Sequence, residues 1–288
     1  MSSHATGAAR SSLAECGSLA EALVLLPGAR VLDLRAREAF ADGHAELAGR
    51  IAPEEFESRR MELPAREQPI VLVHSDPAVA RDAAAFLAAR GYAHLAWLGV
   101  PVERDPDGLV SRASEARLWS PSAFLERVHA SAPAGPALDL ACGTGRATVF
   151  LALEGRESEG WDLDESALER ARAFAERTRA TLATFRRVDL ERDELPAPEP
   201  RHALIVVVRY LHRELFPWIE RSLAPGGVLV YETFRRGQER FGHPKRARHL
   251  LEPGELRSAF PGLVVEEHVE SGDTAPPVMT RFLARRPR

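Results

Sequence analysis

Short apolar runs alternate with helical patterns along most of the chain. In the first part, the runs at 31–34, 70–74 and 94–99 have the length and aliphatic content of buried strands. Helical patterns separate these runs, and the one at 82–92 contains Gly91 near its end, a common residue at helix ends. This alternation predicts a small parallel sheet.

The polar segment 101–117 interrupts the alternation. It contains two prolines and a glycine and has no clear apolar period, so we expect it to be a linker. We therefore expect two domains, at 15–110 and 115–288. A chain of 288 residues with 45% hydrophobic and 28% charged residues has the size and composition of a globular protein with two such domains.

A longer series of strands and helices follows the segment. We predict strands at 137–141, 158–163, 183–189, 203–211, 228–234 and near 263–270 and 278–285, and helices at 145–154, 165–178, 213–223 and 253–260. A series of this kind forms a doubly wound α/β sheet, in which ligands bind at the carboxyl ends of the strands.

Two glycines follow the first of these strands, in the sequence ALDLACGTGR. Glycine lets the backbone approach a ligand closely, and the N-terminus of the next helix favours negative charge. A dinucleotide fingerprint needs a third glycine three residues after Gly145, where Thr148 stands. A cofactor with a pyrophosphate is therefore disfavoured.

Acidic residues lie in or at the ends of successive strands. Asp139 lies in the first strand, and Asp162 ends the second, where an acid can accept hydrogen bonds from both hydroxyls of a ribose. Asp189 ends the third strand, where a carboxylate can accept a hydrogen bond from the exocyclic amine of an adenine. Together with the glycine loop, these acids favour an adenosine ligand without phosphates.

Residues 115–288 resemble the class I S-adenosylmethionine-dependent methyltransferases in the segments LDLACGTGR, GWDLDESALERAR, VDLE and LAPGGVLVYETF. WSPSAFL, VVRYLHRELFP and YETFRRGQERFGHP are similar to a tellurite-resistance-like subgroup. The resemblance implies a Rossmann-like sheet of seven strands with the last strand antiparallel, and S-adenosylmethionine as the cofactor. It also implies that the cofactor contacts Asp139, Ala141, Gly143, Gly145, Asp162, Leu163, Asp189 and Leu190. Ala141 stands where members of the family often have glycine.

Methyl transfer from a sulfonium is an in-line displacement with a neutral leaving group. We therefore expect no metal and no covalent intermediate, and the main contribution of the protein is alignment of the reacting atoms. The candidates beside the methyl group are Arg209, Tyr210 and His212, with Glu232 behind them. Arg209 suits a carboxylate or oxyanion. His212 is either a general base or a residue that caps the next helix or packs beneath the cofactor, and Tyr210 is either a reacting group or an apolar wall.

The acceptor stays open between an oxyanion of tellurium or selenium, a thiol and a small carboxylic acid. The segment 235–248 has six basic residues and one acidic residue, and it is either a lid that attracts an anion or a solvated loop. Nucleic acid is disfavoured because no aromatic stacking motif accompanies this segment. We expect Cys142 in the glycine loop to be a small residue and not a nucleophile.

Residues 15–110 resemble a rhodanese-like domain. The residues that match its opening pattern are Asp33, Arg35, Phe40, Gly43 and His44. An active rhodanese carries sulfur on a cysteine after the central strand, where this chain has His74. Pro77 also removes a backbone donor from the loop that follows. We therefore expect a degenerate module that packs, self-associates or binds a protein partner, and not a sulfurtransferase.

Cysteine content and hydropathy favour a cytoplasmic protein without a membrane partner. The two cysteines, Cys16 and Cys142, form no metal or redox motif, and the apolar stretch at 22–28 is too short to span a membrane. The net charge of −4 includes no strongly basic half. The alternative to a small-molecule methyltransferase is a regulatory protein that binds the cofactor without turnover.

Overall fold

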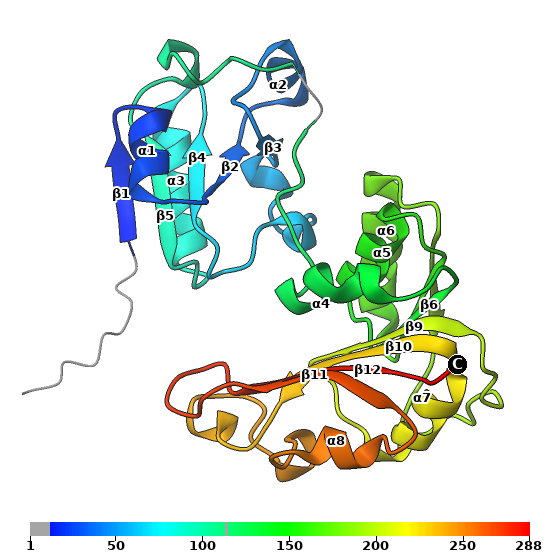
Figure 1. The fold of residues 1–288 in the computed structure, drawn as a ribbon. Helices are drawn as coiled ribbons and strands as arrows, with labels where there is room; N and C mark the ends of the chain where they lie inside the picture. The colour runs from blue at the N-terminus through cyan, green and yellow to red at the C-terminus, as the bar shows by residue number, and fades with distance from the viewer. Residues whose placement is uncertain (1–11, 113–114) are drawn as a thin grey trace, which may run out of the picture. The chain divides into compact units, whose positions relative to one another are not determined.

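The computed structural model describes residues 12–112 and 115–288, and the chain divides into two compact units between Ser120 and Pro121 (Figure 1). We describe each unit by itself. Within the described residues, no helix is long and apolar enough to cross a membrane.

The first unit is built around a parallel sheet of five strands in the order β1-β5-β4-β2-β3. The strands are β1 (Ser12–Cys16), β2 (Arg30–Asp33), β3 (Ala48–Arg50), β4 (Ile70–Val73) and β5 (His94–Leu98). The helices are α1 (Leu19–Leu25), α2 (Arg37–Asp42) and α3 (Pro77–Ala88). All four residues of β4, at the centre of the sheet, are buried, as expected for a parallel strand covered on both faces.

The structure adds three elements that the hydrophobic pattern did not predict, β1, α1 and β3. It also moves the start of α3 from 82 to Pro77, because the Asp76 carboxylate accepts a hydrogen bond from the Ala78 N–H and caps the helix there. Proline is well suited to the first turn that follows such a cap.

The expected linker at 101–117 packs against the first unit, so that prediction is wrong. Val102 is fully buried, Ser111 exchanges backbone hydrogen bonds with His44, and the Ala116 N–H donates to the Ala48 carbonyl next to β3. Leu118, just beyond the segment, belongs to the core of this unit. The segment looks like a linker because it is held by backbone hydrogen bonds and by polar side chains such as Glu103 and Asp105, which leave no apolar period in the sequence.

The second unit contains a mixed sheet of seven strands in the order β11-β12-β10-β9-β6-β7-β8. The strands are β6 (Ala137–Leu140), β7 (Ser158–Asp162), β8 (Ala183–Arg187), β9 (His202–Val208), β10 (Leu223–Phe234), β11 (Val264–Glu270) and β12 (Met279–Arg285). The helices are α4 (Ala123–Val128), α5 (Arg146–Leu153), α6 (Glu165–Thr178), α7 (Phe216–Ser222) and α8 (Glu255–Ala259).

The last strand, β12, lies between β10 and β11 and is antiparallel to both. The predicted α/β sheet of seven strands with an antiparallel last strand is therefore confirmed. Helices α4, α5 and α6 cover one face of this sheet, and α7 and α8 cover the other (Figure 1). The sheet changes direction between β6 and β9, which places a topological switch point at the carboxyl ends of these two strands.

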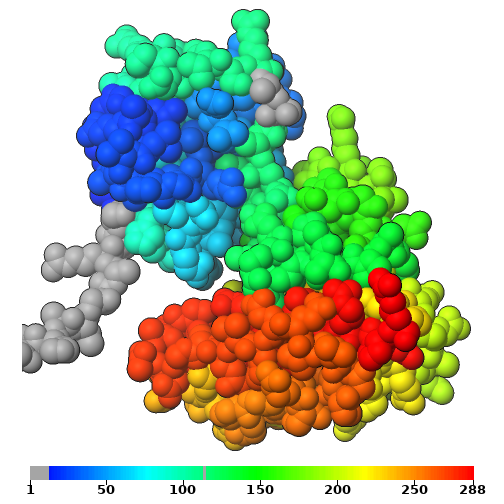
Figure 2. Space-filling model, viewed as in Figure 1, coloured from blue at the N-terminus to red at the C-terminus, as the bar shows by residue number. Residues whose placement is uncertain are grey.

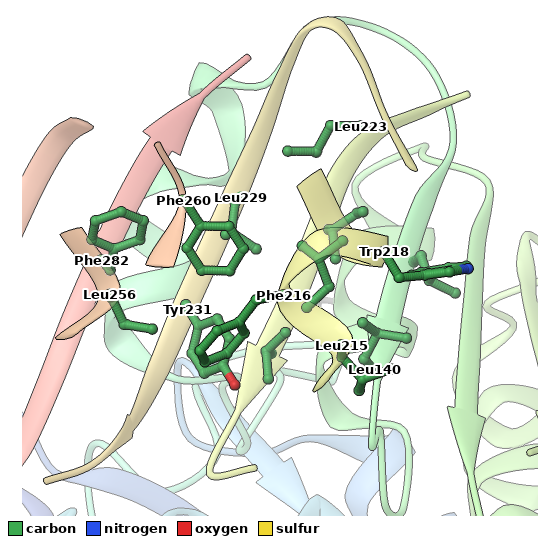
Figure 3. Close-up of a cluster of buried hydrophobic side chains, with 14 of the residues drawn as sticks. Leu140, Leu215, Phe216, Trp218, Leu223, Leu229, Tyr231, Leu256, Phe260 and Phe282 are labelled. Carbon is green, nitrogen blue, oxygen red and sulfur yellow. The ribbon is translucent and has the colours of Figure 1, made fainter. Parts of the chain in front are cut away.

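The largest apolar core lies under α7 and α8. Phe260 lies between Phe216 and Phe282, with ring centroids 5.1 Å and 6.0 Å away (Figure 3). Leu140 and Tyr231, from β6 and β10, belong to the same cluster, so the core joins the strands on both sides of the switch point. This packing holds the strand ends in fixed positions.

Several elements end earlier or begin later than predicted. Strand β9 stops at Val208 and not at 211, because the backbone of Arg209 is left-handed (φ 58°). Strand β8 stops at Arg187, and the helix predicted at 213–223 begins with a 3-10 turn and becomes α-helical at Phe216. The residues directly after β8 and β9 are therefore loop residues at the carboxyl edge of the sheet.

Candidate functional site

The loop between β6 and α5 contains three left-handed residues at alternate positions. They are Ala141 (φ 56°), Gly143 (φ 55°) and Gly145 (φ 75°). The Cys142 N–H donates to the carbonyl of Trp161 in β7, 2.9 Å away, and this bond ties the loop to the neighbouring strand. Ala141 adopts the conformation of a glycine although it has a Cβ, at a cost of about 1–2 kcal/mol.

The two glycines serve different purposes. A Cβ on Gly145 would lie 2.6 Å from the Phe185 ring and 2.9 Å from Cβ of Ala171, so this glycine is required for packing. A Cβ on Gly143 would meet no atom within 4 Å, so open space lies beside its backbone. Only Gly143 therefore leaves room for a ligand to approach the loop.

Asp139 lies beneath this loop and not at its surface. Its side chain is almost fully buried, and one oxygen accepts hydrogen bonds from the Thr148 hydroxyl (2.7 Å) and the Thr148 N–H (3.1 Å). Burial raises the pKa of Asp139 to about 7, the nearby carboxylate of Asp162 raises it further, and the bonds from Thr148 oppose the rise. Thr148, which replaces the third glycine of a dinucleotide fingerprint, thus anchors this acid.

Asp162 lies at the tip of β7, beside the glycine loop. One carboxylate oxygen accepts the Gly143 N–H at 2.7 Å, and the other accepts the Asp164 N–H at 2.9 Å. Asp164 caps α6 through the N–H groups of Ser166 and Ala167. Each oxygen of Asp162 keeps a lone pair for a further donor such as a sugar hydroxyl.

The remaining residues predicted to contact the cofactor differ in exposure. Asp189 follows β8, is half-buried, and accepts the Glu191 N–H at 3.0 Å. Leu163 is 49% exposed beside Asp162, whereas Leu190 is buried in the core under α7 and α8. Leu163 can therefore cover a bound ring from solvent, and Leu190 supports the site from below.

Three predicted catalytic residues follow β9. The Arg209 N–H donates to the Glu232 carbonyl at 2.7 Å, and its exposed side chain has no partner among the described residues. Tyr210 is half-buried, and burial together with Glu191, Asp189 and Asp162 raises the pKa of its phenol. The backbone carbonyl of Tyr210 accepts a hydrogen bond from the hydroxyl of the buried Tyr231 in β10, and this bond fixes the segment to the sheet. The phenol therefore lies on the same side of the site as the acids at the strand ends.

His212 does not cap the helix that follows it, because its side chain makes no capping hydrogen bond. Its Nε2 lies 3.7 Å from the exposed carboxylate of Glu214, and its side chain is 20% exposed. Without the capping role, a general base and a residue that packs beneath the cofactor are the roles left for His212.

Cys142 is unsuited to nucleophilic chemistry. Burial raises the pKa of its thiol, and the carboxylates of Asp139 and Asp162 raise it further. A thiol under these influences stays protonated at neutral pH. The loop accommodates its sulfur because Gly160 in β7 has no side chain, and a Cβ there would lie 2.8 Å from Sγ.

The basic segment 235–248 is held partly by ion pairs and hydrogen bonds within its own unit. Arg236 pairs with Glu252 at 2.9 Å, and Arg240 pairs with Asp273 at 2.9 Å. Gln238 is buried, and its side-chain oxygen accepts the Val278 N–H. Two of the six basic residues in this segment therefore attach it to the rest of the unit through ion pairs.

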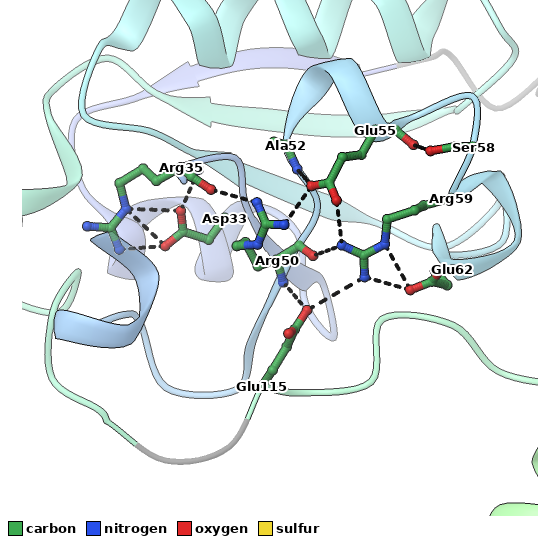
Figure 4. A network of polar contacts seen from close by, with 9 residues as sticks. All are labelled: Asp33, Arg35, Arg50, Ala52, Glu55, Ser58, Arg59, Glu62 and Glu115. Atoms are coloured by element: carbon green, nitrogen blue, oxygen red, sulfur yellow. Dashed lines mark hydrogen bonds and ion pairs between the residues drawn. The ribbon is translucent and has the colours of Figure 1, made fainter. Parts of the chain in front are cut away.

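The five residues of the opening pattern in the first unit form one connected cluster. Arg35 binds the buried carboxylate of Asp33 through Nε and Nη2 and donates to the Gly43 carbonyl at 2.8 Å. The ring of Phe40 stacks on His44 at 4.1 Å. A second network nearby joins the buried side chain of Arg50 and the partly buried side chain of Arg59 to glutamates of the same unit (Figure 4). The residues of the opening pattern thus contact one another and stabilise the fold of the first unit.

The loop after β4 is occupied by its own side chains. Asp76 caps α3, and the Asp76 N–H donates to Nδ1 of His74 at 2.9 Å. Ser75 and Arg35 both donate to the carboxylate of Glu103. These contacts use groups that would otherwise be available to a bound anion at this helix start.

Two observations limit where else a site can lie. Within residues 12–112 and 115–288, no group of three or more His, Cys, Asp or Glu side chains is placed to hold a metal ion. A shallow hollow of about 610 Å³ lies beside α6 and β8, and the candidate residues do not line it. The candidate residues described above lie in or directly after β6, β7, β8 and β9, at the carboxyl ends of these strands.

Comparison with known proteins agrees with this location. A protein-family model described as "Methyltransferase domain" matches residues 137–227. The trans-aconitate 2-methyltransferase of Rhizobium meliloti (strain 1021) is 36% identical over 104 residues, which are 35% of this chain and 38% of that protein. Residues 137–227 thus match a methyltransferase domain, and the chain spans well under half the length of this relative.

Solved structures with a similar fold include methyltransferases. One is an S-adenosylmethionine-dependent methyltransferase from Mesorhizobium loti, with a TM-score of 0.47 and 22% identity over 57% of this chain and 99% of the other. Another is geranyl diphosphate C-methyltransferase from Streptomyces coelicolor A3(2), with a TM-score of 0.45 and 17% identity over 57% and 80% of the two chains.

Proposed function

We propose that the second unit transfers a methyl group from S-adenosylmethionine to a small acceptor that is anionic or reacts through a thiol or oxyanion. The observation that carries this proposal is a pair of left-handed residues, Ala141 and Arg209, at the tips of the adjacent strands β6 and β9. Backbone strain of roughly 1–3 kcal/mol per residue persists mainly where a functional geometry requires it. Here it occurs twice at the topological switch point.

The residues around Gly143 fit the cofactor, because the space beside this glycine is open and Asp162 lies next to it. S-adenosylmethionine supplies a methyl group on a positively charged sulfur. Asp162 would accept the ribose hydroxyls with the lone pairs that its backbone partners leave free. Asp189 would accept the adenine amine, Leu163 would cover the ring, and Asp139 with Ala141, Gly145 and Leu190 would keep the loop in shape.

On the acceptor side, Arg209 would bind negative charge, since its guanidinium projects from a fixed backbone and is exposed. His212 would take a proton from acceptors that must lose one, and Tyr210 would form the wall between cofactor and acceptor. The name of the relative from Rhizobium meliloti adds trans-aconitate to the carboxylic acids worth testing.

The test is release of S-adenosylhomocysteine in the presence of tellurite, selenite, thiols, carboxylic acids including trans-aconitate, and RNA. Asp162→Ala protein serves as the blank. Turnover with one small-molecule class supports the proposal and identifies the acceptor chemistry. Cofactor binding without turnover across the whole panel contradicts it and favours a regulatory protein that senses the cofactor.

For the first unit, we propose a rhodanese-like module without sulfurtransferase activity that self-associates or binds a protein partner. The parallel sheet supports this proposal, and so do the contacts that fill the loop after β4, where His74 replaces a cysteine. The assignment of the second unit to the tellurite-resistance-like subgroup is likewise a proposal, which the acceptor panel tests.

A further inference from the structure

Two arginines of β12 differ in how many of their guanidinium nitrogens donate hydrogen bonds within the protein. Arg281 and Arg285 are four residues apart on one strand, so their side chains leave the same face of the sheet. Each donates through Nε to a glutamate, Arg281 to Glu232 at 3.2 Å and Arg285 to Glu266 at 2.5 Å. In both pairs, therefore, the Nε of the arginine is used by a glutamate.

The terminal nitrogens of the two arginines differ. Nη1 of Arg285 donates to the Gly226 carbonyl at 2.9 Å, and Nη2 donates to the Ser131 carbonyl at 3.0 Å. For Arg281, neither Nη1 nor Nη2 has a partner anywhere in the part of the chain that the structure describes, and its side chain is 40% exposed. Arg281 thus presents two free parallel donors, a geometry that matches a carboxylate or similar oxyanion.

Glu232 holds this guanidinium in place. Its side chain is only 7% exposed and lies on β10, between β9 and β12. Its backbone carbonyl accepts the Arg209 N–H, so one residue contacts both arginines, Arg209 through its backbone and Arg281 through its carboxylate. Because the Glu232 carboxylate is fixed in an interior strand, it holds the Arg281 guanidinium in one orientation before a ligand binds. We call the two terminal nitrogens of this guanidinium the fork.

The strand register places this fork at the carboxyl edge of the sheet. Val208 of β9 pairs with Glu232, and Glu232 pairs with Arg281, so all three lie in one row and their side chains lie on one face. Trp161 pairs with Leu140, so the next positions along, Asp162 and Ala141, continue this row on β7 and β6. Arg285 pairs with Val228 and lies roughly 13 Å away along the strand, toward the opposite edge.

We propose that Arg281, oriented by Glu232, binds an anionic group of the acceptor at a distance from the methylated atom, and that the acceptor is a small organic dianion such as a dicarboxylate. This proposal rests on the function proposed above. Arg281 lies two strand spacings, about 10 Å, from the tip of β9, where Arg209 faces the reacting end of the acceptor. An inorganic oxyanion or a simple thiol is too small to reach both arginines.

The proposed role of Glu232 is positioning, because it acts through Arg281. The C-terminal segments, orange and red in Figure 2, form part of the molecular surface on the face that the figure shows. The basic segment 235–248 directly follows β10, and two of its arginines, Arg236 and Arg240, are already paired with acids. Arg281 is therefore better placed than these arginines to give specificity for an anion.

The experiment measures binding and turnover separately. Dicarboxylic acids of three to six carbons, together with trans-aconitate, are titrated by calorimetry into the full chain saturated with S-adenosylhomocysteine, and each dicarboxylic acid is compared with its monoamide. The wild-type protein should bind a diacid more tightly than its monoamide. Arg281→Gln and Arg281→Lys should weaken diacid binding by about 10- to 100-fold, the usual effect of losing hydrogen bonds to a charged group.

Turnover adds a second readout for any acceptor that reacts. Arg281→Gln should raise KM for the diacid by the same factor with kcat nearly unchanged, and Glu232→Gln should raise it less. The matched control is Arg285→Gln, which removes the saturated arginine of the same strand and should leave both KM and acceptor binding unchanged. Cofactor affinity should stay constant in all four variants.

Three outcomes overturn the proposal. They are a wild-type protein that binds no diacid, an Arg281→Gln variant that binds diacids normally, and an Arg285→Gln variant with the same defect as Arg281→Gln. Failure of the proposed methyl transfer looks different, because diacid binding would then depend on Arg281 while no S-adenosylhomocysteine is released.

Discussion

The Asp162 carboxylate accepts a hydrogen bond from the Gly143 N–H at 2.7 Å, and this bond joins the tip of β7 to the loop after β6. Its other oxygen accepts the Asp164 N–H at 2.9 Å. One side chain therefore shapes the loop and, in the proposed function, also binds the ribose. Loss of this carboxylate should affect the ligand more than the fold.

Asp162→Ala should weaken binding of S-adenosylmethionine by about 5- to 150-fold, because it removes hydrogen bonds to a charged acceptor worth about 1–3 kcal/mol. Asp162→Asn keeps one acceptor oxygen and should lose less. The control is Asp164→Ala, which removes the α6 cap at a cost of about 1 kcal/mol in stability but should leave the affinity unchanged. Calorimetry measures all three, and equal affinities for Asp162→Ala and wild type would show that the cofactor lies elsewhere.

Substitution by alanine should have different effects at the two glycines of the loop. Gly145→Ala should lower the free energy of unfolding by about 2–4 kcal/mol, because its Cβ meets Phe185 and Ala171 and the left-handed backbone adds strain. Gly143→Ala adds only the strain, about 1–2 kcal/mol, since nothing lies within 4 Å.

Denaturant unfolding separates these glycine variants by stability, and calorimetry with S-adenosylmethionine separates them by function. Gly143→Ala should lose affinity although it is the more stable of the two. If the two variants lost equal stability, the packing role assigned to Gly145 would be wrong.

The elements whose ends are marked by neighbouring residues in the sequence were well predicted. Helix α6 has the predicted bounds, because Asp164 caps its start and Arg179 ends it in a left-handed conformation. Strand β7 ends at Asp162, one residue before the predicted end, whereas β8 ends at Arg187, two residues before Asp189. The glycine loop was recognised because its glycines follow an apolar run in the sequence.

Features set by strand pairing were not predictable. Arg281 and Glu232 are 49 positions apart, and only the antiparallel register of β12 brings them together. The left-handed backbones of Ala141 and Arg209 were also missed, since neither residue type favours that conformation. Asp139 was assigned a direct cofactor contact, but its bond to Thr148 depends on how α5 packs against β6.

The buried ion pair of Asp33 and Arg35 should be critical for the first unit. Arg35→Met leaves a fully buried carboxylate without its partner and should cost about 3–5 kcal/mol of stability. The matched control is Arg81→Met, which breaks an exposed pair with Asp82 and should cost less than about 1 kcal/mol. Thermal unfolding of the full chain measures both, and similar midpoints for the two variants would contradict the structural role of the opening pattern.

The buried carboxyl of Asp139 should make stability depend on pH. Its pKa in the folded protein is about 7, against an ordinary value of 3.8, because burial disfavours the charged form. Between these two values the folded protein keeps a proton that the unfolded chain has released. The stabilising contribution is thus complete below about pH 4, declines by at most about 1.4 kcal/mol per pH unit, and is lost above about pH 7.

Asp139→Asn cannot ionise and can still accept a hydrogen bond from Thr148, so it should lack this decline. Relative to wild type, the variant should be more stable at pH 8 than at pH 5, by about 1–3 kcal/mol. Asp82→Asn, at an exposed position, should shift stability equally at both pH values. Denaturant unfolding at the two pH values provides the comparison. Parallel pH profiles for Asp139→Asn and wild type would mean that Asp139 is ionised in the folded protein and that water or a further donor compensates its charge.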